Sequence, residues 1–420
     1  MSAHAAGRTT ERSALQPTLN TQGLGAEARE AQGKSAPALK VCFISPLGYG
    51  LYRPESGVPF GGAEVQFLLL AKELAKGDRC QVQVLTTVAQ APGSEAHGPV
   101  TVIRRQGLRR LESSLGPARR YRGYVEAFRD MYRQLRAMEA DVYLHSGSGV
   151  EVGAYAVICR LLHKRFVYVV ASKADLDEPY GKVLGPLRWL YPVGLRLADA
   201  IVCRTEEQRA LLRERYGRSA ALIRTGHPLP ETGPDPSGPG SILWVGRAHP
   251  LKQPDLFLDL AERLPGERFV MAAMRDQAHP DLLHTLRRRA ATLPQVTFYD
   301  GVPWGESDRL FSQAKLFVNT STFEGFPNTF VQAALHCVPI LSWRVNPDSV
   351  LTTHRIGACA DSSFERLVEE TGRFADDEEL RREAGDRARR YAETHHDVAR
   401  AAEAFNALLR PLVGRQGEAP

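Results

Sequence analysis

The sequence predicts an α/β fold that consists of two doubly wound parallel sheets, each covered by helices on both faces. Short apolar runs typical of buried strands alternate with helical patterns, which favours right-handed βαβ units. The alternation stops at residues 231–240, where three prolines and three glycines in ten residues exclude a helix or strand, and then resumes. With 420 residues, 43% of them apolar and 24% charged, the chain has the composition of a folded protein of two or three domains.

The expected elements follow the apolar runs in chain order. The first series has strands at 39–46, 81–87, 141–145, 165–171 and 200–203, with helices at 65–77, 150–164 and 206–217. The second has strands at 241–246, 268–274, 295–300, 316–322 and 338–343, with helices at 254–264, 280–293, 328–337 and 376–395. We expect a disordered tail at 1–37, a domain at 38–230, a linker at 231–240, a domain at 241–395, a final helix at 396–413 and a tail at 414–420.

Composition and cysteine spacing exclude several classes of protein. No stretch approaches about 18 uninterrupted apolar residues, so we expect no transmembrane helix. The N-terminus lacks the apolar core of a secretory signal peptide. The six cysteines are scattered without a C-x-x-C pair, which favours reduced thiols in a cytoplasmic protein. The net charge of +6 permits anionic partners such as phosphates, lipid head groups or nucleic acid.

Two segments of the second half together predict an anion-binding site. Arg247 and Lys252 fall in the loop after the first strand of that half, and Glu324 and Gly325 fall just before a predicted helix. Arg247 offers a planar fork for a phosphate and Lys252 a point charge. Backbone N–H groups at 326–329 would point out of the helix start. Either loop alone is typical of solvated surface charge, but both loops at the ends of neighbouring strands favour a binding site.

These motifs resemble those of the family 4 retaining glycosyltransferases of the GT-B fold. The resemblance rests on G-R-x₄-K at 246–252, E-G-F-P-N-T-F-x-x-A at 324–333, GGAE at 61–64 and ADAIVCRTEEQRALLRERYG at 198–217. Residues 144–177 resemble a bacterial polysaccharide-synthesis subset of that family. The resemblance implies two Rossmann-like domains facing across a cleft, with the acceptor side at 38–230, the donor side at 241–395, and the final helix crossing back to the first domain.

The resemblance also implies a role for each matching residue. Arg247 and Lys252 would hold the donor diphosphate and Glu324 would lie at the transferred sugar, so these three are the catalytic candidates. The donor-binding candidates, which would line the sugar and phosphates, are Gly61, Gly62, Gly325, Phe326, Pro327, Asn328, Thr329 and Gln332. The implied reaction takes a nucleotide-diphosphate sugar as co-substrate and a saccharide or lipid-linked acceptor, and it needs no cofactor and no metal ion.

The sequence departs from the family pattern at two positions. The family has a second acid eight residues after the first, where it binds the nucleotide ribose, and this chain has Gln332 there. An amide can still bond to ribose hydroxyls, but it loses the stronger charge-assisted bond. Many relatives have a histidine where Ala171 stands. His145, at the end of the preceding strand, is a candidate substitute, although its position favours a strand-end polar residue.

The acceptor-side candidates are Glu64, His145, Ser172, Lys173 and Asp175. Asp175 and Asp177 form a D-L-D triplet, which invites a metal-binding D-x-D interpretation. That motif is typical of the single-domain GT-A enzymes, and the architecture predicted here is different. We therefore expect these acids to contact acceptor hydroxyls or to cap the next helix.

The segment 104–136 holds ten arginines against three acids. Tyr121, Tyr124, Phe128, Met131 and Tyr132 interleave with the charge. On a helix this pattern gives a basic face beside an aromatic one, which suits contact with an anionic membrane at the inner face of the cell membrane. A solvated charged helix is an equally good interpretation. Nucleic-acid binding is disfavoured, because no recognised reading module accompanies the charge.

The resemblance thus implies a hexosyltransferase of cell-surface polysaccharide or glycolipid synthesis. Two alternatives stay open. Gln332 and Ala171 would also suit a catalytically weak or inactive GT-B protein that acts as a binding or scaffold partner in such a pathway. Another nucleotide-sugar enzyme of similar fold, such as an epimerase or phosphorylase, is the second alternative.

Overall fold

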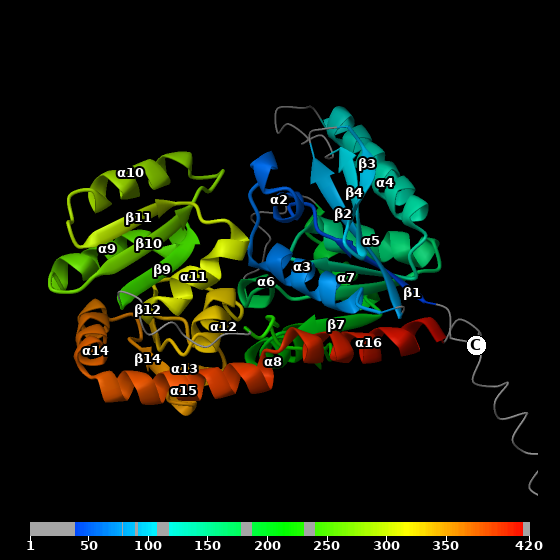
Figure 1. The fold of residues 1–420 in the computed structure, drawn as a ribbon. Coiled ribbons are helices and arrows are strands. Elements are labelled where there is room, and N and C mark those ends of the chain that lie inside the picture. Colours follow the sequence, from blue (N-terminus) through cyan, green and yellow to red (C-terminus); the bar gives the residue numbers. More distant parts are fainter. Residues whose placement is uncertain are drawn as a thin grey trace, which may run out of the picture. The chain divides into compact units, whose positions relative to one another are not determined.

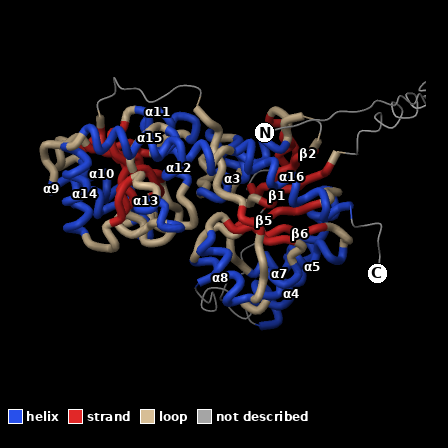
Figure 2. The backbone as a smooth tube through the Cα atoms, turned by 90° about the horizontal axis from the view of Figure 1, so that it is seen from below, coloured by secondary structure: helices blue, strands red, loops and turns tan. Residues whose placement is uncertain are grey.

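A computed structural model describes residues 38–77, 79–88, 91–106, 117–177, 187–230 and 240–414, with the side chains of 117–121 left aside. The predicted tail at 1–37, the linker at 231–239 and residues 415–420 lie outside this range. The described part holds two sheets, and helices cover both faces of each (Figures 1 and 2). The predicted pair of doubly wound α/β domains is therefore confirmed.

The first sheet has eight strands in the order β3-β4-β2-β1-β5-β6-β7-β8. Its strands are β1 Leu39–Ile44, β2 Cys80–Val88, β3 Gly93–His97, β4 Val100–Gln106, β5 Val142–Ser146, β6 Arg165–Val169, β7 Ala200–Cys203 and β8 Ala221–Leu222. The helices of this half are α2 Tyr49–Tyr52, α3 Gly62–Leu74, α4 Pro117–Met138, α5 Val150–Leu161, α6 Ala174–Asp177, α7 Leu190–Leu197 and α8 Glu206–Tyr216.

Alternate residues of each central strand pack on opposite faces of the sheet. In β1, Val41 and Phe43 join the apolar cluster that includes Phe67 of α3, whereas Cys42 and Ile44 join the cluster that includes residues of α5. Because both faces are covered, the strand is apolar along its whole length. This explains why continuous apolar runs predicted the strands correctly. Each large side chain that is fully buried in this way contributes about 2 kcal/mol to the free energy of unfolding.

The edge of the first sheet differs from the prediction of a purely parallel sheet. Strands β3 and β4 form an antiparallel hairpin, and β4 then pairs with β2 in parallel. The turn of the hairpin holds Gly98 with φ of 58°, a left-handed conformation that favours glycine. Strand β3 is polar and only half-buried, so it carries no apolar run that would reveal it in the sequence.

The second sheet has six parallel strands in the order β11-β10-β9-β12-β13-β14. They are β9 Ser241–Arg247, β10 Phe269–Met274, β11 Val296–Asp300, β12 Ala314–Asn319, β13 Ile340–Ser342 and β14 Gly357–Cys359. Its helices are α9 Pro254–Arg263, α10 Pro280–Ala290, α11 Ser307–Ser312, α12 Asn328–Leu335, α13 Val350–Thr353, α14 Phe364–Asp376 and α15 Glu378–His395. Strand β14 and helix α14 were not expected from the sequence.

The arginine-rich segment is not a single helix. Arg104 and Arg105 lie on β4, and α4 begins only at Pro117. Met131 of α4 is buried, and Phe128 and Tyr132 pack against the same apolar cluster, so these side chains face the protein and not a membrane. The expectation that these aromatic and apolar side chains contact a membrane is therefore wrong. The exposed arginines of α4 still provide a basic surface, so the electrostatic part of the membrane hypothesis stays a prediction. Among the described residues, no helix is both long and apolar enough to span a bilayer.

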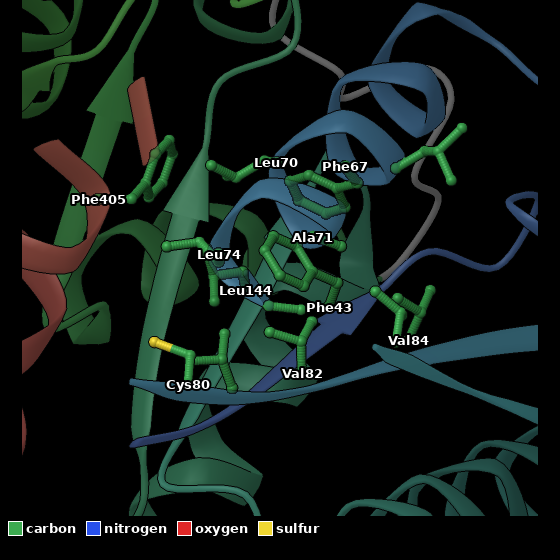
Figure 3. Close-up of a cluster of buried hydrophobic side chains, with 14 of the residues drawn as sticks. Phe43, Phe67, Leu70, Ala71, Leu74, Cys80, Val82, Val84, Leu144 and Phe405 are labelled. Carbon is green, nitrogen blue, oxygen red and sulfur yellow. The ribbon is translucent and has the colours of Figure 1, made fainter. Parts of the chain in front are cut away.

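The last helix, α16 Val398–Gly414, crosses back to the first sheet, as predicted. Its side chains Ala402, Phe405 and Leu409 are buried in the same cluster as Leu70 and Leu74 of α3. Figure 3 shows Phe405 beside these two leucines. This packing fixes one face of α3, the helix whose N-terminal end borders the candidate site.

A second contact joins the two halves of the fold at the N-terminus of α8. The carboxylate of Asp348, between β13 and β14, accepts hydrogen bonds from the backbone N–H groups of Glu206 at 3.0 Å and Glu207 at 3.1 Å. Its Oδ2 also lies 3.0 Å from Nη1 of Arg224. Asp348 thus binds the N-terminus of a helix that belongs to the other sheet, beside the helix's own N-cap Thr205.

Candidate functional site

The carboxyl ends of both sheets border one cavity of about 240 Å³. Open α/β sheets bind ligands at this edge. The first half contributes the start of α3 and the residues that follow β6 and β7, and the second half contributes the end of β9 and the segment before α12. Every predicted catalytic and donor-binding candidate lines this cavity: Gly61, Gly62, Arg247, Lys252, Glu324, Gly325, Phe326, Pro327, Asn328, Thr329 and Gln332. The predicted convergence of these segments is therefore present, while the role of each residue stays a prediction.

Arg247 is the last residue of β9, and a buried acid orients it. Its Nη1 donates to Oδ2 of Asp276 at 3.1 Å, and Asp276 is only 4% exposed. The other oxygen of Asp276 accepts the backbone N–H of Ala278 at 2.9 Å. Because the carboxylate is itself held, the guanidinium is positioned at the cavity before any ligand arrives.

Lys252 and Glu324 form an ion pair at the cavity wall. Lys252 ends a 3-10 turn at Pro250–Lys252, and Glu324 follows β12. Ser321 donates through Oγ to the same Glu324 oxygen at 2.8 Å. Asn319 in turn donates to Ser321 Oγ at 3.3 Å and accepts the Ser321 N–H at 3.2 Å. The end of β12 thus holds the Glu324 carboxylate from one side and Lys252 holds it from the other.

Helix α12 directs its N-terminus at the same cavity. It begins at Asn328 after the N-cap Pro327, and no described side chain caps it. The unpaired N–H groups of a helix start carry a partial positive charge that favours an anion. Arg247 and Lys252, although each is paired with a carboxylate, add charged hydrogen-bond donors to the same wall, so the second half of the cavity offers several groups that can bind an anion.

The start of α12 also touches the first half of the fold. Asn328 Nδ2 donates to the carbonyl oxygen of Gly62 at 3.0 Å, so α12 and α3 begin close together (Figure 1). A Cβ on Gly325 would lie 2.3 Å from the carbonyl oxygen of Ala171, so only glycine fits there. Gly325 therefore stands where two backbones approach each other, whereas a Cβ on Gly62 would meet the side chain of Asn328 at 3.2 Å.

Gln332 lines the cavity with its amide held from behind. Its Nε2 donates to Ser307 Oγ at 3.0 Å and to Asp308 Oδ1 at 3.1 Å. Both amide hydrogens are thereby used, and Oε1 remains as an acceptor. Burial opposes ionisation of Asp308, but hydrogen bonds from His336 and Gln332 outweigh it and lower the pKa of Asp308.

Two acceptor-side candidates, Glu64 and His145, do not line the cavity. Glu64 Oε2 accepts the N–H of Gly61 at 2.9 Å and so caps α3. His145 is 4% exposed, its Nδ1 lies 3.2 Å from the carbonyl oxygen of Ile44, and its ring packs edge-on against Tyr155. Burial lowers the pKa of His145 to about 4. The structure favours a strand-end polar residue over a substitute for the missing family histidine.

The D-L-D segment is held by local contacts. Asp175 is buried inside α6, and its Oδ2 accepts the N–H groups of Ala171 at 2.8 Å and Ser172 at 3.1 Å, while its Oδ1 accepts the Ser172 hydroxyl at 3.3 Å. Asp177 pairs with Arg215 at 2.7 Å. Asp175 thus fixes the turn that precedes α6, and a contact of either acid with acceptor hydroxyls stays a prediction. Ser172 and Lys173 lie next to Ala171 but outside the cavity lining.

Two residues at the cavity, Ser321 and Arg204, were not predicted from the sequence. Ser321 positions Glu324 through a contact that a sequence pattern does not reveal. Arg204 lines the cavity directly after β7. A charged residue at the end of a buried strand is the same signal that singled out Arg247, and it was present in the sequence. Burial lowers the pKa of Arg204 to about 10.

One group of described side chains has the composition of a metal site. The ligand atoms of His249, Asp276 and His279 all lie within 4.8 Å of one another. Both oxygens of Asp276 are already bonded, as described above, and His249 Nδ1 accepts the N–H of Leu251 at 3.1 Å. These contacts support the loop that follows Arg247, and a metal ion would have to displace them.

Two family models match adjacent parts of the chain. The model described as "Glycosyltransferase Family 4" matches residues 60–228, and the model described as "Glycosyl transferases group 1" matches residues 230–391. The first match covers the half that contains the first sheet, and the second covers the half that contains the second sheet.

Curated relatives and solved structures agree with these matches. D-inositol 3-phosphate glycosyltransferases of Mycobacterium tuberculosis and Mycobacterium bovis are 28% identical in an alignment of 194 residues. The match covers 39% of this chain and only 40% of theirs. Sucrose-phosphate synthase of Thermosynechococcus elongatus superposes with a TM-score of 0.70 at 17% identity, over 90% of this chain and 100% of that one. HepE of Anabaena, solved with UDP and glucose, gives 0.65 at 16% identity, over 89% and 99%. The structural likeness concerns the fold.

Proposed function

The chain belongs to glycosyltransferase family 4 and has the GT-B fold, and from this premise we propose that it transfers a hexose from a nucleotide-diphosphate donor to a saccharide or lipid-linked acceptor. The observation that carries the proposal is the cavity in which Arg247, Lys252, Glu324 and the start of α12 converge. HepE, which was solved with UDP and glucose, supports a donor of this chemical class.

The chemistry follows from the charge that develops in the reaction. Breaking the bond between the anomeric carbon and the phosphate oxygen leaves negative charge on the diphosphate. Arg247, Lys252 and the α12 N-terminus stabilise that charge by charge-assisted hydrogen bonds and by the helix dipole. In this proposal these groups take the place of a divalent cation, so the reaction is metal-independent.

Glu324 orients the donor sugar at the end of the diphosphate. Its carboxylate is paired with Lys252, and the donor shares or replaces that pair when it binds. The acceptor hydroxyl attacks the anomeric carbon from the same face as that from which the diphosphate leaves, and a phosphate oxygen takes the hydroxyl proton. The anomeric configuration is therefore retained. Because no protein nucleophile takes part, Ala171 in place of the family histidine is compatible with activity.

The acceptor is less closely constrained than the donor. A lipid-linked acceptor would bring the protein to an anionic membrane surface, where exposed arginines of α4 contribute attraction. Arg129 and Arg136 are exposed, whereas Arg122 and Arg133 are partly neutralised by Glu126 and Asp130. We keep the soluble saccharide and the lipid-linked saccharide as two acceptor classes within the proposal.

Release of nucleoside diphosphate tests the activity directly. Purified protein is incubated with UDP-, GDP- and ADP-hexoses, with and without saccharide acceptors, and the anomeric configuration of the product is read by NMR. We expect release from one donor class, retained configuration and loss of transfer in Glu324→Ala. No release from any donor by a protein that still binds nucleotide would favour the scaffold alternative. An inverted product or an epimerised donor would refute retaining transfer.

A further inference from the structure

Arg204 is a buried guanidinium without a counter-ion. The residue follows β7, is 5% exposed and lines the cavity. Its backbone N–H donates to Gln208 Oε1 at 2.8 Å, but none of the ion pairs or side-chain hydrogen bonds among the described residues involves its guanidinium. The two other cations of the cavity wall, Arg247 and Lys252, each have a carboxylate partner.

An unpaired buried charge is costly, so its retention calls for an explanation. A guanidinium removed from water loses several kcal/mol of hydration unless an anion or hydrogen-bond acceptors replace that water. A long side chain that merely fills space keeps its charged head in bulk solvent, and the small exposed fraction of Arg204 excludes this arrangement. The remaining open side of the guanidinium is the cavity. A cavity ligand is therefore the group that would complete its bonding.

The charge of the cavity wall indicates what that ligand is. Its lining includes three cations, Arg204, Arg247 and Lys252. Because Arg247 is paired with Asp276 and Lys252 with Glu324, the charge of Arg204 is the unbalanced one, and the N-terminus of α12 adds a partial positive charge. A diphosphate, with two negative charges at neutral pH, can bond to Arg204 and to this helix start at once, whereas a neutral saccharide would leave the charge of Arg204 uncompensated.

The neighbours of Arg204 place it near the sugar end of that diphosphate. Strand β7 pairs with β6, and the residue after β6 is Ala171, whose carbonyl oxygen is in close approach to Gly325. Gln208, which holds the backbone of Arg204, has its Nε2 3.4 Å from the position of a Cβ on Gly325. Arg204 therefore approaches, from the first half of the fold, the same turn that carries Glu324.

We propose that Arg204 is a third cation of the donor site and binds the distal, sugar-bearing phosphate from the side opposite Arg247 and Lys252. The inference rests on the proposed function and adds to it a residue to which the family resemblance assigned no role. A bound diphosphate then has cations from both halves of the fold. It also supplies the acceptor oxygens that the guanidinium does not find among the described residues.

The test compares nucleotides that differ only in the distal phosphate. The full chain and the variants Arg204→Met and Arg204→Lys are titrated calorimetrically with UDP, GDP and ADP, and the tightest of these is compared with its monophosphate. Arg213→Met, an exposed arginine on α8, is the matched control. We expect Arg204→Met to weaken diphosphate binding about tenfold to a hundredfold, with the monophosphate affinity changed by less than about threefold. Arg204→Lys, which keeps the charge, should recover part of the loss.

A melting curve separates this role from a structural one. Because the variant loses an unpaired buried charge, Arg204→Met measured without nucleotide should have a melting temperature equal to or above that of the unchanged protein. Diphosphate affinity equal to that of the unchanged protein would overturn the proposal, and so would an equal loss for mono- and diphosphate. An effect confined to the KM of an anionic acceptor would assign Arg204 to the acceptor instead. If the unchanged protein binds no nucleoside diphosphate, the proposed function itself fails.

Discussion

The carbonyl oxygen of Ala171 lies 2.3 Å from the place that a Cβ on Gly325 would occupy. Ala171 follows β6 of the first sheet, and Gly325 lies between Glu324 and the start of α12 in the second half. The missing side chain at position 325 therefore allows the two walls of the cavity to approach each other.

Gly325→Ala should separate these walls. The new methyl meets backbone, which cannot move aside as a flexible side chain can, so we expect a loss of about 1–3 kcal/mol in the free energy of unfolding. Nucleoside diphosphate affinity should fall at least about tenfold, because the N-terminus of α12, which follows residue 325 closely in the chain, shifts together with it. Chemical denaturation and calorimetric titration measure the two effects. Gly305→Ala is the control, since a Cβ there meets nothing within 4 Å; equal behaviour of both variants would contradict the close approach.

Ser321→Ala should impair catalysis without impairing nucleotide binding. Ser321 donates to the Glu324 carboxylate at 2.8 Å, and its loss leaves that group held by Lys252 alone. Removing one hydrogen bond to a charged group corresponds to about a tenfold lower rate of transfer. The Kd of the free nucleoside diphosphate, which lacks the sugar, should stay unchanged. Ser312→Ala, which removes an exposed hydroxyl bonded to Arg309, is the control. Unchanged kcat in Ser321→Ala would exclude the positioning role.

Gln332→Glu should lower the stability of the protein, although it restores the family's second acid. Gln332 Nε2 lies 3.1 Å from Asp308 Oδ1, so the variant would place two carboxylates about 3 Å apart. We expect the free energy of unfolding to fall by about 1 kcal/mol near pH 8 and to recover near pH 5, where one group of the pair takes up a proton. Adding Asp308→Asn should remove the penalty, because its amide can donate to the new carboxylate. A stable single variant at both pH values would show that Asp308 does not act on residue 332.

Buried histidines should make the fold sensitive to acid. Burial lowers the pKa of His145 and His227 to about 4 and that of His396 to about 3, whereas the unfolded chain has a histidine pKa near 6.5. The folded state therefore binds fewer protons below about pH 6.5, and stability is lost as the pH falls from there toward 4. At about pH 5 each buried histidine costs about 2 kcal/mol.

Urea denaturation at about pH 7.5 and pH 5 checks this dependence. The difference in unfolding free energy between the two pH values should shrink by about 2 kcal/mol in His145→Gln. The exposed His284 on α10 provides the control variant, His284→Gln, whose difference should match that of the unchanged protein. An unchanged difference in His145→Gln would mean that His145 takes up its proton in the folded state.

The central strands and the donor-side wall could be predicted from the sequence, because both depend on local patterns. Strands buried on two faces are continuous apolar runs, and Arg247, Lys252 and Glu324 each stand beside such a run. The β3–β4 hairpin could not be predicted in this way, since an edge strand with polar residues resembles a loop.

The hydrogen-bond partners of individual side chains also could not be predicted from the sequence. Asp175 and His145 looked like acceptor-side groups. The bond of His145 to Ile44 depends on the pairing of β1 with β5, and the bonds of Asp175 depend on the conformation of the turn after β6. Arg204 had the sequence signal of a strand-end charge and was passed over, because its burial and lack of a partner become visible only in the folded chain.

Nucleoside diphosphate binding tests the central claim most directly. Melting curves with UDP, GDP and ADP are recorded for the unchanged protein, for Arg247→Ala and for Arg268→Ala, an exposed arginine before β10 that lies outside the cavity. We predict that at least one nucleotide raises the melting temperature of the unchanged protein and of Arg268→Ala, and that Arg247→Ala abolishes the shift. No shift with any of the three nucleotides, or an undiminished shift in Arg247→Ala, would contradict the assignment of this cavity to the donor diphosphate.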